Sequence, residues 1–107
     1  MPSRITWTLA AWDDYLYWQG QDRKTLKRIN GVIRDCLREP FAGIGKPEPL
    51  KENLSGFWSR RLDDAHRLVY CVDGDDLVII ACRYHYDNTS WFRALRLLLP
   101  PETRALT

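Results

Sequence analysis

The chain has 107 residues and a formal net charge of +2, from 16 Lys and Arg against 14 Asp and Glu. This length allows one compact domain with a single core and excludes two ordinary domains joined by a linker. Hydrophobic residues make up 45% and charged residues 28% of the sequence, a balance that excludes a disordered or coiled-coil protein. The apolar runs are too short to cross a bilayer and no secretion signal precedes Trp7, so we expect a cytoplasmic protein.

Cysteine content and charge narrow the functional classes further. The three cysteines form no CxxC pair, and no group of His, Cys and Asp has metal-ligand spacing, so we expect neither a metal nor another cofactor. The small net charge does not indicate a general nucleic-acid-binding surface. Five Trp and five Tyr exceed what one small core needs, so we expect some of these rings to face a ligand or a partner.

The N-terminal part of the chain predicts a strand followed by two helices. Residues 4–9 alternate apolar and polar side chains, as expected for a half-buried strand. A first helix from about residue 10 to Gly20 would carry Trp12, Tyr15, Leu16 and Gln19 on one face. Asp22 is a suitable N-cap for a second helix over residues 23–39, which the following proline ends.

The two faces of the second predicted helix differ in character. The inner face has apolar residues at helical spacing, namely Leu26, Ile29, Ile33, Cys36 and Leu37. The outer face carries cations: Arg23, Lys24, Lys27, Arg28, Arg34 and Arg38. We interpret this outer face as a solvated surface in preference to a specific phosphate-binding one.

The C-terminal half predicts a loop and then a small antiparallel sheet. Residues 41–50 contain two Gly and two Pro, which argues against a helix or a strand there. Alternating runs at residues 55–62, 66–72 and 77–86 are separated by turn residues and predict an antiparallel meander. Two helices packed on such a sheet make an α+β domain, and residues 91–99 predict a short C-terminal helix.

Glu48 is the first candidate for a functional residue, because it lies between Pro47 and Pro49. Proline fixes φ at both neighbours, so the position of this carboxylate is set at little cost in folding. Such rigidity suits a carboxylate that takes part in chemistry. A surface glutamate in a rigid turn is the alternative, and the spacing alone leaves both open.

Two arginines at neighbouring strand ends are the second candidate. Alternation places Arg60 and Arg61 on opposite faces of their strand, and a three-residue loop would set Arg61 directly opposite Arg67. Like charges in that position destabilise a sheet unless an anion lies between them. The alternative is that a nearby carboxylate neutralises them, from Asp63, Asp64 or Glu52.

His85 is the third candidate, because it follows a strongly apolar strand and lies between Tyr84 and Tyr86. A histidine at the mouth of a strand is a reasonable general acid, although a hydrogen-bonded structural histidine is the commoner case. The hairpin register decides its neighbours. An odd turn or a bulge pairs the Arg67 face with Arg83 and His85, whereas an even turn pairs it with Cys82, Tyr84 and Tyr86.

A carboxylate, several cations, a histidine and exposed tyrosines are the groups needed for metal-free cleavage of RNA. A base takes the proton of the ribose 2′-OH, and that oxygen attacks the adjacent phosphorus. Cations stabilise the charge on the non-bridging oxygens, and an acid protonates the leaving 5′ oxygen.

The sequence resembles the YoeB toxins of the RelE/ParE superfamily in five segments. These segments are residues 12–19, 45–51, 53–61, 66–70 and 81–86. The resemblance implies a microbial-ribonuclease-like α+β fold and a homodimer. It also implies a ribosome-dependent endonuclease that cuts mRNA in the ribosomal A site and is neutralised by a YefM-type antitoxin.

The resemblance also implies roles for individual residues. Glu48 matches the general base, His85 the general acid and Arg67 the arginine that stabilises the transition state. The remaining matches are Tyr86, which lines the site, and Lys51 and Arg61, which contact RNA; we add Lys46 and Arg83 as further RNA contacts.

One departure from the family concerns the C-terminal end. Typical members end near the position of Tyr86, whereas this chain continues to residue 107. We therefore expect a toxin domain over residues 1–86 and an extension over residues 87–107 that is not a separate domain. The extension could shield the site, enlarge an interface or be neutral. The alternative function is a toxin-fold protein that binds without cleaving, such as a gyrase-type inhibitor or a repressor partner.

Overall fold

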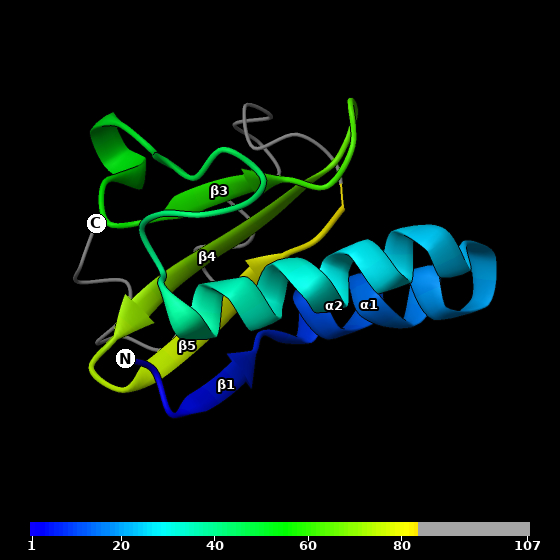
Figure 1. Cartoon of the computed structure of the whole chain (residues 1–107), viewed down its shortest axis with the longest axis horizontal. Coiled ribbons are helices and arrows are strands. Elements are labelled where there is room, and N and C mark those ends of the chain that lie inside the picture. The colour runs from blue at the N-terminus through cyan, green and yellow to red at the C-terminus, as the bar shows by residue number, and fades with distance from the viewer. Residues whose placement is uncertain (84–107) are drawn as a thin grey trace.

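The computed structural model describes residues 1–83 and has an α+β fold, as predicted (Figure 1). The predicted C-terminal helix at residues 91–99 lies outside the described residues. In chain order the elements are β1 (Arg4–Trp7), α1 (Leu9–Gln21), α2 (Arg23–Arg38), β2 (Glu48–Pro49), the 3₁₀ helix η1 (Glu52–Leu54), β3 (Trp58–Arg61), β4 (Arg67–Asp73) and β5 (Asp76–Ala81).

The strands form one sheet in the order β1-β5-β4-β3-β2. The predicted meander of β3, β4 and β5 is confirmed, because these strands are antiparallel neighbours. The sheet as a whole is mixed and not antiparallel, since β1 pairs with β5 in parallel. No hairpin joins these two strands, and the chain between them passes through both helices and the meander, so nothing local imposes an antiparallel direction.

The loop predicted at residues 41–50 contains a short strand, which corrects the prediction. Glu48 pairs with Ser59 and Pro49 with Trp58 at the edge of the sheet. Proline is compatible with an edge strand because its missing N–H is not needed by a further neighbour. The predicted run at residues 77–86 is shorter than expected, because β5 ends at Ala81.

Helix α1 begins one residue after Thr8, whose hydroxyl accepts a hydrogen bond from the Ala11 N–H at 3.0 Å. The helix continues through Gly20 to Gln21, one residue beyond the predicted end. Its buried residues are Ala11 and Trp18. On the predicted face, Trp12 and Leu16 are 43% and 44% exposed, so this face is not the one that the helix buries. The small Ala11 side chain faces the sheet, and the Trp12 ring packs instead at the rim, against Trp7 and Tyr15.

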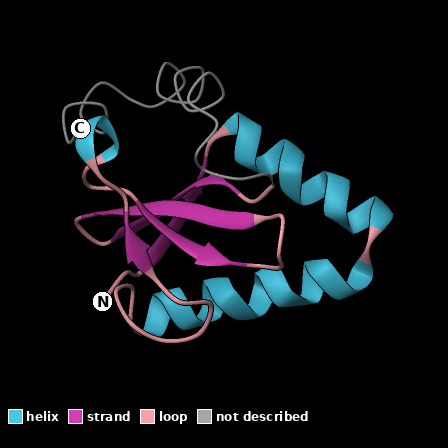
Figure 2. Cartoon of the chain, turned by 90° about the horizontal axis from the view of Figure 1, so that it is seen from above, coloured by secondary structure: helices cyan, strands magenta, loops and turns pink. Residues whose placement is uncertain are grey.

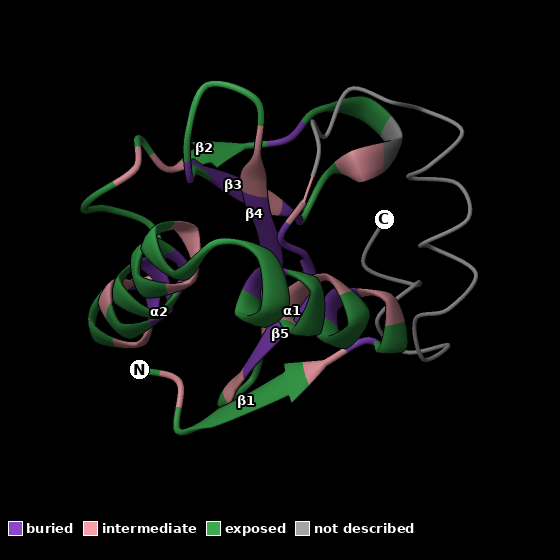
Figure 3. Ribbon diagram, turned by 90° about the vertical axis from the view of Figure 1, so that its right-hand side faces the viewer, coloured by how far each residue is buried: buried purple, intermediate pink, exposed green. Residues whose placement is uncertain are grey.

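Helix α2 is confirmed with its predicted cap. The Asp22 carboxylate accepts hydrogen bonds from the backbone N–H groups of Lys24 and Thr25 at 3.1 and 3.3 Å. The helix buries Ile29, Val32, Ile33 and Cys36. Figure 2 shows α1 and α2 as a hairpin joined at one end beside the strands, and their outer surfaces are largely exposed in Figure 3.

The sheet has a buried cluster on each face. One cluster lies between the helices and the sheet and includes Trp18, Ile29, Leu68, Tyr70 and Ile79. The other lies on the helix-free face, where Leu50, Leu54 and Phe57 pack against strand residues Val69, Cys71, Val78 and Ile80. Figure 3 shows the central strands as the most buried part of the chain.

Within residues 1–83, all three cysteines are free and buried, as expected of core residues. The described part of the chain holds no group of three or more His, Cys, Asp or Glu side chains arranged to bind a metal ion. No helix in that part is both long and apolar enough to cross a membrane.

Candidate active site

Strand β2 places Glu48 on the helix-free face of the sheet. Residues that pair directly across strands point to the same face, and Glu48 pairs with Ser59, which in turn pairs with Val69. Val69 belongs to the cluster on the helix-free face. The Glu48 side chain is exposed, and it makes no hydrogen bond or ion pair with any residue of the range 1–83.

Arg61 and Arg67 lie on the same face as Glu48. They pair directly, as the sequence predicted, and each is two residues from the Ser59–Val69 pair. From the usual strand spacing and rise, the Cα atoms of Arg61 and Arg67 are about 8 and about 12 Å from that of Glu48. Long arginine side chains span such distances toward a shared phosphate. One glutamate and two arginines therefore share this face of the sheet.

The alternative prediction was that a nearby carboxylate neutralises Arg61 and Arg67, and no salt bridge among residues 1–83 supports it. Among residues 1–83, neither arginine forms a salt bridge. The Asp63 carboxylate accepts hydrogen bonds from the N–H groups of Ala65 and His66 instead, and so holds the turn. Arg67 Nη1 donates to the backbone carbonyls of Asp63 and His66, at 3.0 and 3.2 Å. Within residues 1–83 this pair of arginines has no salt-bridge partner, and an anion such as a phosphate would supply the counter-charge.

Arg60 has a role that the sequence did not reveal. It points to the helix side of the sheet, and its side chain is fully buried. Its Nη1 donates to the Asp35 carboxylate at 2.7 Å and to the Ile44 carbonyl at 3.1 Å. The remaining contacts run from Nη2 to the carbonyls of Glu39 and Ala42 and from Nε to the Tyr70 hydroxyl. One guanidinium thus ties the loop after α2 to the sheet.

Asp35 is the anion that pairs with this buried cation and offsets the cost of burying its charge. Its Oδ2 also accepts from the Ile44 N–H at 2.9 Å, so the carboxylate anchors the loop as well. The hydrogen bonds from Arg38, the Ile44 N–H and Arg60 hold the pKa of Asp35 well below its usual range. The sequence contained one signal for the role of Arg60. This arginine faces inward beside a loop rich in glycine and proline, and the carbonyls of such a loop lie outside regular structure.

Two glycines fix the path of the loop toward Glu48. Gly43 and Gly45 have φ values of 125° and 81°, and a Cβ at Gly43 would collide with the Asp35 carboxylate. The Gly45 carbonyl accepts from the Arg61 N–H at 2.6 Å, so the loop is bonded to β3 three residues before Glu48, where β2 begins. The carboxylate is therefore positioned by the sheet on one side and by the Arg60 network on the other.

The other predicted RNA contacts lie around this face. Lys46 and Lys51 flank β2, and both are exposed. Lys46 has a φ of 51°, a left-handed conformation that belongs to the same tight loop. These two residues place positive charge at either end of the segment that carries Glu48.

The end of β5 contains the bulge that one of the two predicted registers required. Tyr70 pairs with Ile79, whereas Val69 pairs with Ala81. Pairing stops at Ala81, and the guanidinium carbon of Arg83, two residues further on, lies 3.5 Å from the centre of the Tyr17 ring of α1. His85 and Tyr86 lie outside the described residues, so the roles predicted for them stay predictions.

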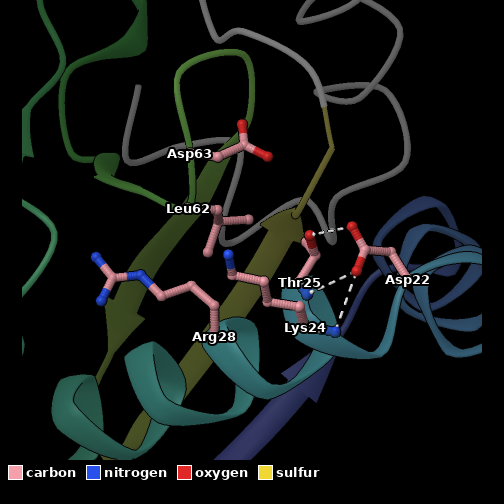
Figure 4. Close-up of a pocket in the computed structure, with 6 residues that line it drawn as sticks. All are labelled: Asp22, Lys24, Thr25, Arg28, Leu62 and Asp63. Atoms are coloured by element: carbon pink, nitrogen blue, oxygen red, sulfur yellow. Dashed lines mark hydrogen bonds between the residues drawn. The ribbon is translucent and has the colours of Figure 1, made fainter.

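A separate hollow of about 330 Å³ lies between the start of α2 and the turn after β3 (Figure 4). It contains none of the predicted site residues, and it is lined by Asp22, Lys24, Thr25, Arg28, Leu62 and Asp63. Its carboxylates are already engaged, because Asp22 caps α2 and Asp63 holds the turn. Arg28 donates to the Arg61 carbonyl at 3.3 Å. We therefore regard this hollow as part of the scaffold.

Asp14 is a half-buried carboxylate on α1 that contacts the end of β5. Its Oδ2 accepts a hydrogen bond from the Cys82 N–H at 3.1 Å. Burial raises the pKa of Asp14 to about 6, and the Cys82 N–H and the positive charge of Arg83 oppose this increase.

The Asp14→Asn variant tests this pKa through the pH dependence of stability. Because the pKa is raised from 3.8, the folded protein binds this proton more tightly than the unfolded chain. The resulting stabilisation is complete below pH 3.8 and is lost as the pH rises through about 6. We expect the free energy of unfolding, measured by urea titration, to fall relative to that of the variant over this range. The same pH dependence in both proteins would contradict the assignment.

Comparison with known proteins places this geometry in a family. The model of a protein family described as "YoeB-like toxin of bacterial type II toxin-antitoxin system" matches residues 7–86 of this chain. Toxin YoeB from Escherichia coli strain K12 is 60% identical over 83 residues, which cover 78% of this chain and 99% of that protein. The matched range ends at Tyr86, the last residue of the predicted toxin domain.

Solved structures agree with the sequence match. The YoeB/ParE toxin from Agrobacterium tumefaciens has a TM-score of 0.76 and 50% identity, covering 78% of this chain and 99% of that one. A YoeB dimer and a YoeB-YefM complex, both from Staphylococcus aureus, each have a TM-score of 0.73. They are 46% and 45% identical to this chain and cover 78% of it and 97% of their own chains. The chain belongs to the YoeB-like toxins of bacterial type II toxin–antitoxin systems.

Proposed function

We propose that the helix-free face of the sheet is the active site at which this chain cuts mRNA. YoeB toxins are ribosome-dependent mRNA endonucleases, and this chain is a member of that family. The observation that carries the proposal is the gathering of Glu48, Arg61 and Arg67 on one face, with no salt bridge to either arginine among residues 1–83. Such a face holds a base beside a place for a phosphate.

The proposed reaction uses side chains alone. Glu48 takes the proton of the ribose 2′-OH, and the freed oxygen attacks the adjacent phosphorus. Arg67 stabilises the charge that builds on the non-bridging oxygens. As the bond to the 5′ oxygen breaks, His85 gives that oxygen a proton, and Tyr86 lines the site. The products are a 2′,3′-cyclic phosphate and a 5′-hydroxyl end, so atoms and charges balance.

The surrounding cations hold the neighbouring phosphates of the message. Lys46 and Lys51 flank the base, and Arg61 faces Arg67 across the strand pair. Arg83 follows the end of β5 and stacks on the Tyr17 ring of α1, and we retain it as a further RNA contact. A few cations around one phosphate give local positive potential without a basic protein surface.

The net charge of +2 predicts dependence on the ribosome. Because so small a positive field holds free RNA weakly, the ribosomal A site must bring the message to the toxin. We expect the purified protein to cut translated mRNA far faster than the same RNA without ribosomes, as measured by primer extension in a reconstituted translation system. Equal rates on both substrates would contradict the proposal.

We infer partners from the relatives and from the exposed apolar surface. The Staphylococcus aureus relatives were solved as a dimer and as a complex with YefM. In this chain, large apolar side chains are exposed on β1 and α1, namely Ile5, Leu9, Trp12, Leu16 and Tyr17. Such a surface fits the predicted homodimer or the predicted YefM-type antitoxin.

We also retain the predicted division of the chain. Residues 1–86 form the toxin domain, and residues 87–107 form an extension without the size of a separate domain. The family match over residues 7–86 supports this division. Action on ribosomes places the protein in the cytoplasm.

A further inference from the structure

One helix holds the chain where it leaves the sheet after β5. The Cys82 N–H donates to Asp14 Oδ2 at 3.1 Å, and the Cys82 carbonyl accepts from Trp18 Nε1 at 2.8 Å. The Cys82 thiol donates weakly to the Ala11 carbonyl at 3.8 Å. Asp14 and Trp18 are four residues apart in α1, so their side chains lie on one stripe of the helix.

These contacts replace the sheet at this point. β5 ends at Ala81, just after the bulge, and Cys82 is the first residue beyond the strand. Both backbone polar groups of Cys82 are nevertheless bonded, to side chains of α1. Arg83 is held by the same helix, with its guanidinium carbon 3.5 Å from the centre of the Tyr17 ring. The direction of the chain is thus set by α1 and not by strand pairing.

Trp18 also contacts the other strand end that the reaction uses. Its ring packs edge-on against the His66 ring, with the centroids 4.8 Å apart. His66 directly precedes Arg67, the first residue of β4. Trp18 is only 6% exposed, so it fills the space between the start of β4 and the end of β5. A single side chain therefore contacts both His66, which precedes the proposed cation, and Cys82, three residues before the proposed acid.

We propose that Asp14 and Trp18 are positioning residues for mRNA cleavage, because they hold the Cys82 peptide, three residues before His85. The inference rests on the proposed function, because it is His85 that gains from this placement. Neither residue touches the RNA.

The expected size of the effect follows from the geometry of proton transfer. A general acid works only within hydrogen-bonding reach of the leaving oxygen, and His85 is three residues beyond the held peptide. A displacement of about 1 Å costs a catalyst about 10²-fold in rate. Loss of one of two bonds to Cys82 should therefore slow the chemical step without weakening the binding of toxin to the ribosome.

Variants that remove one bond at a time test the proposal. Trp18→Phe keeps an aromatic ring beside His66 but removes the N–H that bonds the Cys82 carbonyl. Asp14→Ala removes the acceptor for the Cys82 N–H, and Asp14→Asn retains one. The measurement is single-turnover cleavage of ribosome-bound mRNA over a range of toxin concentrations, which separates the maximal rate from the half-saturating concentration.

We expect Trp18→Phe and Asp14→Ala to lower the maximal rate by about 10- to 100-fold with an unchanged half-saturating concentration. Asp14→Asn should restore most of the rate lost in Asp14→Ala. Unchanged maximal rates in both Trp18→Phe and Asp14→Ala would overturn the proposal, as would an Asp14→Asn variant as slow as Asp14→Ala.

Thr8→Ala is the matched control for a loss of stability alone. Thr8 also joins α1 to β5, because its hydroxyl donates to the Ile80 carbonyl at 3.1 Å and caps the helix. We expect this variant to melt at a lower temperature yet to reach the full maximal rate. A rate loss as large as that of Trp18→Phe would show that destabilisation explains the effect and would overturn the proposal. Glu48→Gln, run in parallel, reports on the proposed chemistry separately: full activity there refutes the base and not the positioning residues.

Discussion

Replacing Glu48 with Gln will lower the maximal rate of ribosome-dependent mRNA cleavage by about 10²- to 10⁴-fold, the usual contribution of a general base. Glutamine keeps the size and polarity of the side chain but cannot accept the 2′-OH proton. Because the Glu48 side chain is exposed and has no partner among residues 1–83, the melting temperature should not change. Cleavage by primer extension and thermal unfolding are the two measurements.

Glu52→Gln is the matched control for this variant. Glu52 is an exposed glutamate four residues further along the chain, at the start of η1. Its removal changes the charge of the protein by the same amount, yet it should leave the cleavage rate unchanged. If Glu48→Gln cuts ribosome-bound mRNA as fast as Glu52→Gln does, Glu48 is not the base.

Local signals in the sequence were sufficient for much of the fold. Asp22 predicted the start of α2 because a carboxylate at that position satisfies free N–H groups, and the structure has those hydrogen bonds. The turn after β3 predicted the pairing of Arg61 with Arg67, since loop length fixes hairpin register. Both features depend only on residues that are close in the sequence.

Features that depend on distant contacts were not predictable in the same way. The direction of β1 depends on its pairing with β5, more than 70 residues away. The bulge between Val69 and Tyr70 shifts the register by one residue. No Gly or Pro in β4 or β5 predicts this bulge. The buried face of α1 depends on what packs against it, so the aromatic stripe was a misleading guide to the core.

The same distinction between local signals and distant contacts applies to the residues of the candidate site. Glu48 was found because two prolines mark it locally, and Arg61 and Arg67 because their register follows from a turn. The role of Arg60 was not predicted, since its partners come from Asp35, from loop carbonyls and from Tyr70, which only the folded chain brings together. The residues proposed to react carry local signals, whereas the signal for Arg60 does not reveal which distant groups it binds.

Replacing Arg60 with Met will destabilise the domain by about 3–5 kcal/mol, the cost of removing one partner from a buried ion pair. The methionine leaves the Asp35 carboxylate with one partner fewer and the carbonyls of Glu39, Ala42 and Ile44 without their donor. Small domains have only about 5–15 kcal/mol of stability in total, so the variant should melt at a much lower temperature. Urea and thermal unfolding measure the change.

Arg61→Met is the matched comparison, one residue further along the same strand. Arg61 is exposed and forms no salt bridge among residues 1–83, so its loss should change stability by no more than about 0.5 kcal/mol. It should still slow mRNA cleavage, because the proposed site loses one of its two facing cations. The two neighbouring arginines thus separate stability from catalysis. Arg60→Met should lower the melting temperature, whereas Arg61→Met should stay folded and cut mRNA more slowly. Equal melting temperatures for both variants would show that the Arg60 network does not hold the loop.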